Sequence, residues 1–457
     1  MSRKLVPATI LTVILMAMLT LAFNFRQIRS EPRTIIVSDN FQTIQEAITL
    51  ANPGDTIFVK NGTYYEHVIV NRTVSLVGEN RETTIIDGSG IGTVMKVTAD
   101  NVTIMGFTIR NSGKEWTDSG LALRQVKNCS LSGNNITANN GHGIYLYTSP
   151  NNSIFGNNIA ANNWGGMWIS TSSNYNSITG NNVTANKGNG IWLDSSNYNS
   201  IFGNNIANNK DGLVFCGPSN NRIVGNNIAN NRGDGIRLFF SPNNTIFHNN
   251  FVENQQQFYT FKSYGNLWDD GYPSGGNYWS NFTGVEVKSG SYQNETGSDG
   301  IGDTPCSIDA NNTDRYPLMT PFSTFKAGTW NNVTYNIDIM SNSTVSKFHL
   351  NELQKKISFN VTGTDYTSGF CRVTIPNVII QDLWQGHYAV LVNGQPVEFR
   401  NWTHTENTYI YFTYQHSEHE VTIIPEFFSI MILPLFMIAT LSAVIVYRKY
   451  PHATAQE

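Results

Sequence analysis

The stretch Gly133-Asn134-Asn135-Ile136 returns along the middle of the chain at a nearly fixed spacing. It recurs at Gly156, Gly180, Gly203 and Gly225, and then as His248-Asn249-Asn250-Phe251, at spacings of 22 to 24 residues. A second signature, Gly143-Ile144-Tyr145-Leu146, recurs in step with it from Gly166, Gly190, Gly212 and Gly235. A fixed period in this range is typical of a solenoid.

Each repeat contains three short alternating stretches separated by Asn and Gly, which predicts three strands and three turns in a coil. We therefore expect an all-β parallel β-helix whose coils stack about 4.8 Å apart. The Ile and Leu of the second signature are expected to point inward as apolar columns. Asn accounts for 58 of the 457 residues, 28 of them between 151 and 250, and we expect each turn Asn to bond to the Asn of the next coil.

The remaining composition excludes several classes of protein. The net charge is -4 and the pI is about 6.1, so the chain has no basic surplus for nucleic acid. Apolar residues make up 40% of the chain, which excludes charge-driven disorder. Four cysteines do not make a disulfide scaffold. Cys129 and Cys216 are about four coils apart, too far to bond to each other.

The flanking regions differ from the repeat. Residues 34–265 are predicted to form the β-helix, with looser coils over about 55–130. A capping helix is predicted over 41–51, because the apolar residues at 44, 47, 48 and 51 have helical spacing. Residues 266–321 are expected to form its C-terminal end. Over 322–424 longer alternating stretches and an Asn393-Gly394 hairpin turn predict a small β-sandwich. It resembles the Ig-like modules of archaeal surface proteins, which implies a stalk or spacer.

Apolar runs lie at both ends of the chain. Leu5 to Phe23 follow Arg3 and Lys4, so residues 1–30 read as a signal peptide or signal anchor. Phe427 to Tyr447 precede Arg448 and Lys449, and residues 425–450 read as a transmembrane anchor or sorting signal. The basic flanks keep both ends inside and export the rest. With fifteen N-x-S/T sequons, this predicts a membrane-anchored glycoprotein of the cell surface.

Three further stretches support a family resemblance. The entry Phe41-Gln42-Thr43-Ile44-Gln45-Glu46-Ala47-Ile48, the segment Gly54-Asp55-Thr56-Ile57 and the Gly-Asn-Asn-Ile units resemble right-handed, single-stranded parallel β-helix proteins of the pectin-lyase-like superfold, nearest to the NosD-type or CASH group. Asn277-Tyr278-Trp279-Ser280 and Asp299-Gly300-Ile301-Gly302-Asp303 look like the C-terminal end of archaeal members. Pro425-Glu426-Phe427 resembles an archaeal PEF-type sorting signal. The resemblance covers about 35–320. It implies the fold but no single activity, because this fold carries lyases, hydrolases, esterases and binders alike.

One outward column of the repeat carries aromatic residues. In Gly-Ile-x-Leu the residue x points to solvent, and Tyr145, Trp168 and Trp192 occupy it on three successive coils. Flat rings beside hydroxyls and carboxylates suit sugar faces, so these three residues are candidate carbohydrate ligands. The alternative is that a loop or the sandwich covers the column, or that the stack only stabilises the sheet.

Candidates for catalysis lie near this column. Asp194, Asp211, Asp234 and Arg237 fall on neighbouring coils, and Asp211 and Asp234 are expected about 5 Å apart, a spacing that a retaining glycosidase uses. Asp211 and Asp234 each also lie beside a Gly at a turn, where Asp is commonly only a turn former.

Candidates for a metal site are few. Asp299 and Asp303, with Asp309 and Asp314 nearby, offer oxygens to calcium without completing an EF-hand pattern. Copper, which the NosD name implies, lacks clustered soft ligands here, because His142 and His248 are several coils apart.

Three functions are therefore open. The first is an archaeal cell-surface protein whose β-helix binds carbohydrate or another envelope component through the outward aromatic column. The second is an extracellular polysaccharide lyase or glycoside hydrolase, which an acid and base paired in a cleft would favour. The third is a structural or adhesion protein, which a covered aromatic column would favour.

Overall fold

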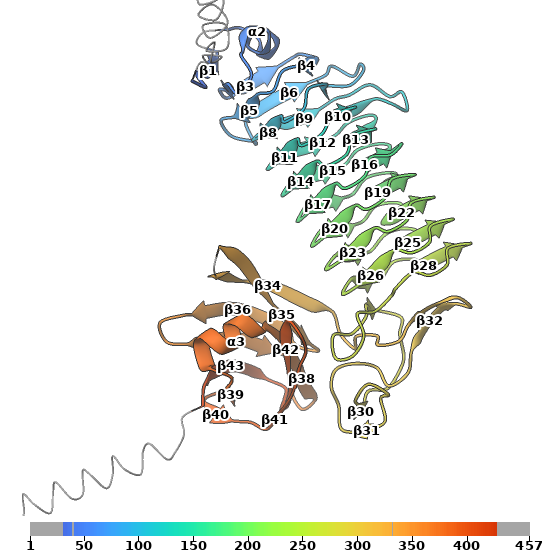
Figure 1. Cartoon of the computed structure of the whole chain (residues 1–457), viewed down its shortest axis with the longest axis vertical. Coiled ribbons are helices and arrows are strands. Elements are labelled where there is room, and N and C mark those ends of the chain that lie inside the picture. The colour runs from blue at the N-terminus through green and yellow to red at the C-terminus, as the bar shows by residue number, and fades with distance from the viewer. Residues whose placement is uncertain (1–30, 39–40, 331, 427–457) are drawn as a thin grey trace, which may run out of the picture.

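A computed structural model describes residues 31–38, 41–330 and 332–426. A parallel β-helix of three sheets leads to a separate antiparallel domain beside its C-terminal end (Figure 1). The predicted all-β class, with a β-helix followed by a small sandwich, is thus confirmed. Both terminal apolar runs lie outside the described residues. Within that part of the chain, neither helix has the length and apolar character needed to cross a membrane.

Three parallel sheets run the length of the β-helix and are numbered in the order the chain visits them. Sheet 1 contains β1 (Thr34–Val37), β2 (Thr56–Val59), β5 (Ser75–Gly78), β8 (Thr103–Met105), β11 (Ser130–Ser132), β14 (Ser153–Phe155), β17 (Ser177–Thr179), β20 (Ser200–Phe202), β23 (Arg222–Val224) and β26 (Thr245–Phe247). Sheet 2 contains β3 (Gly62–Tyr64), β6 (Thr84–Asp87), β9 (Thr108–Arg110), β12 (Asn135–Thr137), β15 (Asn158–Ala160), β18 (Asn182–Thr184), β21 (Asn205–Ala207), β24 (Asn227–Ala229), β27 (Asn250–Val252) and β29 (Tyr278–Trp279). Sheet 3 contains β4 (Val68–Val70), β7 (Met95–Val97), β10 (Ser119–Arg124), β13 (His142–Tyr147), β16 (Gly165–Ser170), β19 (Asn189–Asp194), β22 (Leu213–Cys216), β25 (Asp234–Phe239) and β28 (Gln256–Phe261).

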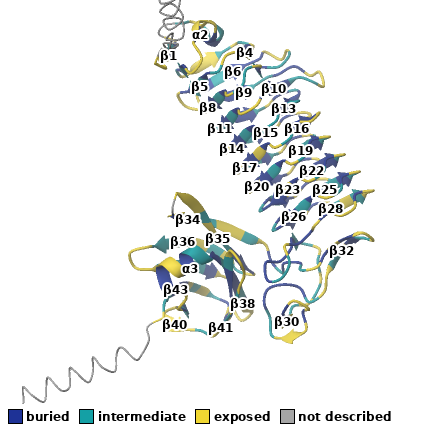
Figure 2. Cartoon of the chain, viewed as in Figure 1, coloured by how far each residue is buried: buried dark blue, intermediate teal, exposed yellow. Residues whose placement is uncertain are grey.

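The core of the β-helix is a set of stacked apolar columns. In sheet 3, Ile144, Met167, Ile191, Leu213 and Ile236 are successive partners in register, and each is fully or almost fully buried. Figure 2 shows buried residues alternating with more exposed ones along the β-helix. The inward register predicted from the Gly-Ile-x-Leu signature is therefore confirmed.

Buried asparagine ladders hold the three corners between the sheets. At the corner between sheets 1 and 2, the Asn157 and Asn181 side chains each accept from the backbone N–H and the amide of the previous rung, at 3.0 Å. The other two corners repeat this pattern, for example from Asn162 to Asn186 and from Asn176 to Asn199. The ladders satisfy turn groups that would otherwise be buried without partners, which is why the chain needs so much Asn.

Both ends of the β-helix are closed. Helix α2 (Ile44–Leu50) covers the N-terminal end with Ile44, Ala47 and Ile48 buried, and the Thr43 hydroxyl caps it by accepting from the Glu46 N–H at 3.1 Å. At the other end Trp279 stacks on Phe251 with ring centroids 4.3 Å apart. Short antiparallel pairs complete this end: β30 (Lys288–Ser289) with β31 (Glu295–Thr296), and β32 (Cys306–Asp309) with β33 (Asn312–Asp314).

The C-terminal domain is two antiparallel five-stranded sheets. One contains β34 (Phe322–Trp330), β35 (Val333–Ser341), β38 (Ser368–Pro376), β42 (Asn407–Gln415) and β41 (Phe399–Thr403), and the other β36 (Thr344–Asn351), β37 (Lys356–Thr362), β43 (Glu418–Pro425), β39 (Tyr388–Val392) and β40 (Gln395–Pro396). Helix α3 (Asn377–Trp384), which alternation did not predict, packs Ile379 and Leu383 into its core. The buried Arg372 joins the domain to the β-helix by donating to the Asp299 carbonyl at 2.9 Å and to the Pro273 carbonyl.

Candidate functional site

The predicted aromatic column forms in the predicted register. Tyr145 pairs with Trp168 and Trp168 with Trp192 on successive strands of sheet 3. Their rings stack, with centroids 4.5 Å apart for the first pair and 5.2 Å for the second. All three side chains leave the outer side of the sheet, because their neighbours in the strand fill the core.

The expected solvent exposure of this column is wrong for two of the three rings. Tyr145 exposes 2% of its surface and Trp168 exposes 6%. Residues 111–118 between β9 and β10 are longer than the equivalent connection 138–141, and this segment brings Trp116 to 5.2 Å from the Trp168 ring. Arg124 covers Tyr145 at 5.0 Å. A longer turn, which the repeat pattern does not describe, therefore buries the middle of the column.

The aromatic surface is instead a cluster of tryptophans, comprising Trp116, Trp164, Trp168 and Trp192, which are four of the nine in the chain. Trp116 is 57% exposed, Trp164 is 48% exposed and Trp192 is half-buried. His142 links them, with its ring 5.3 Å from Trp168 and 6.0 Å from Trp164. Sequence reasoning missed Trp116 and Trp164 because both lie in turns, outside the aligned positions. The signal in the sequence that could have found them is that both are tryptophans.

A pocket of about 180 Å³ opens between Trp164 and Trp192. Lys210 and Asn189 line it, and Gly165 and Gly188 contribute no side chain to its wall. His142 also lines it, 5% exposed, and burial lowers the pKa of this imidazole to about 4, so the ring is neutral near pH 7. Its Nδ1 has no hydrogen-bond partner among the described residues. The pocket thus combines indole faces with an amide and an ammonium group, beside a neutral buried imidazole.

The candidate catalytic residues lie further along the same face. Arg237 donates to Asp234 at 2.5 Å and lies 3.8 Å from Asp211, whose carboxylate accepts the Asp234 N–H at 2.9 Å. Burial raises the pKa of Asp234, and Arg237 opposes that shift. Asp194 stands apart, accepting from Ser195 at 3.1 Å. The structure brings Asp211, Asp234 and Arg237 together as an ion-paired group and leaves Asp194 outside it.

The candidate calcium residues, Asp299 and Asp303, are both engaged by N–H donors. Asp299 accepts from the Ile301 N–H at 2.9 Å and from the Gln293 amide at 3.2 Å. Asp303 accepts from the N–H groups of Val287 and Lys288. Among residues 31–38, 41–330 and 332–426, no group of three or more His, Cys, Asp or Glu could hold a metal ion.

Comparison with known proteins gives one family. The family model described as "Right handed beta helix region" matches residues 33–201 and 119–295, together more than half of the chain. No curated protein matches the sequence.

Solved structures with a similar fold share little sequence with this chain. Pectate lyase Pel9A is 13% identical, with a TM-score of 0.42, over 57% of this chain and 84% of that one. An alginate lyase from Paenibacillus sp. strain FPU-7 is 16% identical, with a TM-score of 0.31, over 54% and 97%. The ORF18 protein of Geobacillus virus E2 is 14% identical, with a TM-score of 0.36, over 72% and 69%.

Proposed function

We propose, from the premise that this chain belongs to the right-handed β-helix family, that it binds carbohydrate on the outer face of sheet 3. The observation that carries this proposal is the tryptophan cluster, with Trp164 and Trp192 on either side of a polar pocket. Large exposed aromatic side chains gathered on one surface usually mark a contact site.

The chemistry of the pocket suits a sugar ring. An indole face packs against the apolar C–H face of a pyranose, while hydroxyls at the ring edge need hydrogen-bond partners. Lys210 and Asn189 supply such partners. Trp192 stacks on the buried Trp168 of the preceding coil, which in turn stacks on the buried Tyr145, so Trp192 is held in place before the ligand arrives.

Binding is favoured over catalysis by the state of the acidic group. A general acid and base must be free to exchange protons with the substrate. Arg237 contacts both Asp211 and Asp234, which holds the two carboxylates in an ion-paired arrangement. A lyase or hydrolase activity at these residues would first require Arg237 to move away.

The proposal includes the cell surface as the place of action. The resemblance to NosD-type or CASH proteins, the sequons and the two apolar terminal runs support an exported, anchored protein. Protease treatment of intact cells is the test: loss of residues 34–424 with survival of an intracellular control protein is expected. Survival of the β-helix under these conditions would contradict the placement.

A polysaccharide array, with analysis of released products, tests the binding proposal on the purified full chain. Trp164→Ala with Trp192→Ala should weaken binding by roughly 2–4 kcal/mol, at about 1–2 kcal/mol for each stacked ring. Tyr175→Ala with Tyr198→Ala is the matched control, because these rings are also stacked and about half exposed but lie on another corner.

Two outcomes would contradict the proposal. If the tryptophan variant binds as the wild type does, the cluster has only a structural role. If the wild type releases shortened or unsaturated products, the protein is an enzyme and the acidic group must be reconsidered.

A further inference from the structure

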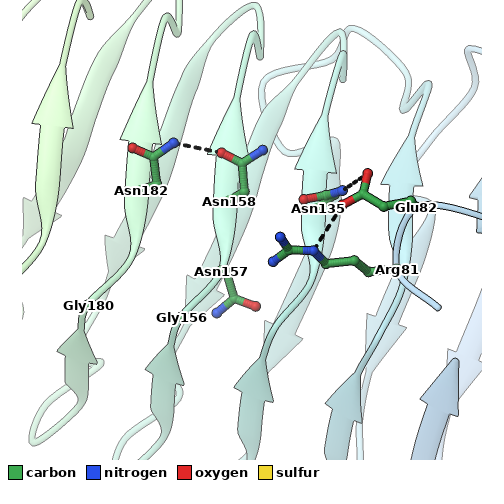
Figure 3. Close-up of a pocket in the computed structure, with 8 residues that line it drawn as sticks. All are labelled: Arg81, Glu82, Asn135, Gly156, Asn157, Asn158, Gly180 and Asn182. Carbon is green, nitrogen blue, oxygen red and sulfur yellow. Dashed lines mark hydrogen bonds and ion pairs between the residues drawn. The ribbon is translucent and has the colours of Figure 1, made fainter. Parts of the chain in front are cut away.

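A second groove lies away from sheet 3, at the corner between sheets 1 and 2. One part of it, of about 380 Å³, is lined by Asn135, Asn158 and Asn182, with Arg81 and Glu82 at one end of the row (Figure 3). The next part, of about 400 Å³, shares Gly180 with the first and is closed on its far side by β34 and β35. The groove therefore follows the long axis of the β-helix over several coils and ends between the two domains.

An outward ladder of amides forms one side of this groove, and it is interrupted. Asn227 donates to Asn205 at 2.8 Å, Asn205 to Asn182 at 2.7 Å, and Asn182 to Asn158 at 2.8 Å. The series stops at Asn158, whose amide does not donate to Asn135 within the described residues, and the Asn135 amide itself donates to Glu82 at 3.0 Å. Figure 3 shows the Asn158 nitrogen on the side facing Asn135.

The interruption leaves hydrogen-bonding groups open to the groove. Within the part of the chain that the structure describes, neither the Asn158 Nδ2 nor the Asn135 Oδ1 has a bonding partner. Asn135 is 9% exposed and lines the groove. One donor and one acceptor therefore face the same space, an arrangement that hydroxyl groups can satisfy because each both donates and accepts.

An outward column of sheet 1 forms the other side: Phe202 lines the second part of the groove, and Phe155 belongs to the same column. Phe155 and Phe202 point outward from sheet 1 and are 44% and 41% exposed. They stand two coils apart, about 10 Å along the axis, with Thr179 between them. Between the rings and the amides lie Gly156, Gly180 and Gly203, where an added Cβ would meet nothing within 4 Å. A ligand can therefore approach the bare backbone at each rung.

Charge and strand geometry exclude two other ligands. Arg81 pairs with Glu82 at 3.0 Å, so the two charges at this end of the groove balance and give no net attraction for an anionic chain. A peptide cannot add as a strand here, because every strand of sheets 1 and 2 pairs along the axis and presents no free edge at the corner. A linear neutral polyhydroxylated chain satisfies the rings and the amides together.

We propose that this corner groove binds a neutral polysaccharide chain running along the axis of the β-helix. Sugar rings lie on Phe155 and Phe202, and hydroxyl groups bond to Asn158 and Asn135. The site goes beyond the carbohydrate surface proposed on sheet 3, because it uses other sheets, another corner and the β34–β35 hairpin.

Calorimetric titration of the full chain with cellohexaose, mannohexaose and chitohexaose tests the proposal. At least one is expected to bind, and Phe155→Ser with Phe202→Thr should weaken that binding at least about tenfold, by loss of two ring contacts. These replacements copy Ser132 and Thr179 of the same column, so the fold should be kept. Asn158→Asp keeps the acceptor for Asn182 but removes the open donor, and should weaken binding too.

Two controls separate this site from sheet 3. Phe240→Ser removes an exposed ring elsewhere and should leave binding unchanged. The Trp164→Ala and Trp192→Ala pair removes the proposed surface on sheet 3, and in that background the phenylalanine replacements should still weaken the remaining binding at least about tenfold. The proposal is wrong if none of the three hexasaccharides binds at millimolar concentration, if the phenylalanine variant binds as the wild type does, or if only the tryptophan variant loses binding. The last result would place all binding on sheet 3.

Discussion

Tyr145 and Trp168 stack nearly parallel, with ring centroids 4.5 Å apart and an angle of 16° between their planes, on adjacent coils of sheet 3. Both side chains leave the outer side of the sheet, yet neither exposes more than 6% of its surface. The pair thus forms a small apolar cluster outside the main core, together with Ala122 and the half-buried Tyr147 and Trp192. This second cluster supports the outer face of sheet 3, where carbohydrate is proposed to bind.

Burial of this pair predicts a difference between two tryptophans of the cluster. Trp168→Ala should lower the free energy of unfolding by about 3–5 kcal/mol, because it empties a packed site. Trp164→Ala should change it by less than about 1 kcal/mol, since Trp164 is 48% exposed. Urea unfolding of both variants is the measurement. Equal losses in the two variants would show that Trp168 is not more deeply buried than Trp164.

The inward register predicts the effect of changing Ile191, which is fully buried between Met167 and Leu213. Ile191→Asp should unfold the neighbouring coils, because the carboxylate would enter a dry column without a partner. Ile191→Val should cost only about 0.5–1.5 kcal/mol. Thermal unfolding followed by circular dichroism distinguishes them, and an Asp variant that melts like the wild type would refute the register.

Two adjacent asparagines should differ sharply in their contribution. Asn181 donates to the Ile154 carbonyl and to Asn204, and accepts twice from Asn157. Asn181→Ala would leave several buried groups unpaired, at about 1–3 kcal/mol each. Asn182→Ala is the control, since that side chain lies outside in the partly exposed ladder and should cost about 1 kcal/mol or less. Similar losses in urea unfolding would mean that the ladder does not determine stability.

His142 should make stability depend on pH. Burial lowers the pKa of His142 to about 4 from its ordinary 6.5, so the unfolded chain binds this proton at a higher pH than the folded chain does. The stability of the wild type should therefore be complete above about pH 6.5 and fall by up to about 3 kcal/mol as the pH drops to 4. Other groups titrate in this range too, so the difference between variants isolates the effect.

His142→Asn provides that difference, because Asn189 already occupies the same column. The variant should lose less stability between pH 6.5 and 4 than the wild type loses. His67→Asn, at an exposed position, should keep the wild-type profile. Parallel pH profiles for all three proteins would show that His142 is not buried in its neutral form.

The sequence by itself determined the architecture, because every coil repeats the same alternation of apolar residues and the same asparagines at its turns. Ile191 is inward since alternation leaves one face of each strand apolar, and Asn181 is buried since the turn needs an amide that bonds to both neighbouring rungs. The same periodicity aligned Tyr145, Trp168 and Trp192. A small sandwich was predictable from its alternating strands, whereas α3 was not, because an eight-residue helix leaves too short a periodic signal.

Only the tertiary structure decided which side chains meet solvent. Burial of Trp168 depends on Trp116, which comes from a turn outside the repeat and is 52 residues away in sequence. The groove beside Asn158 depends on Glu82 and on a hairpin of the other domain, neither of which the repeat encodes. Periodicity fixes the direction of a side chain from its own strand. Exposure is set by whatever distant segment packs over it, so it requires the folded chain.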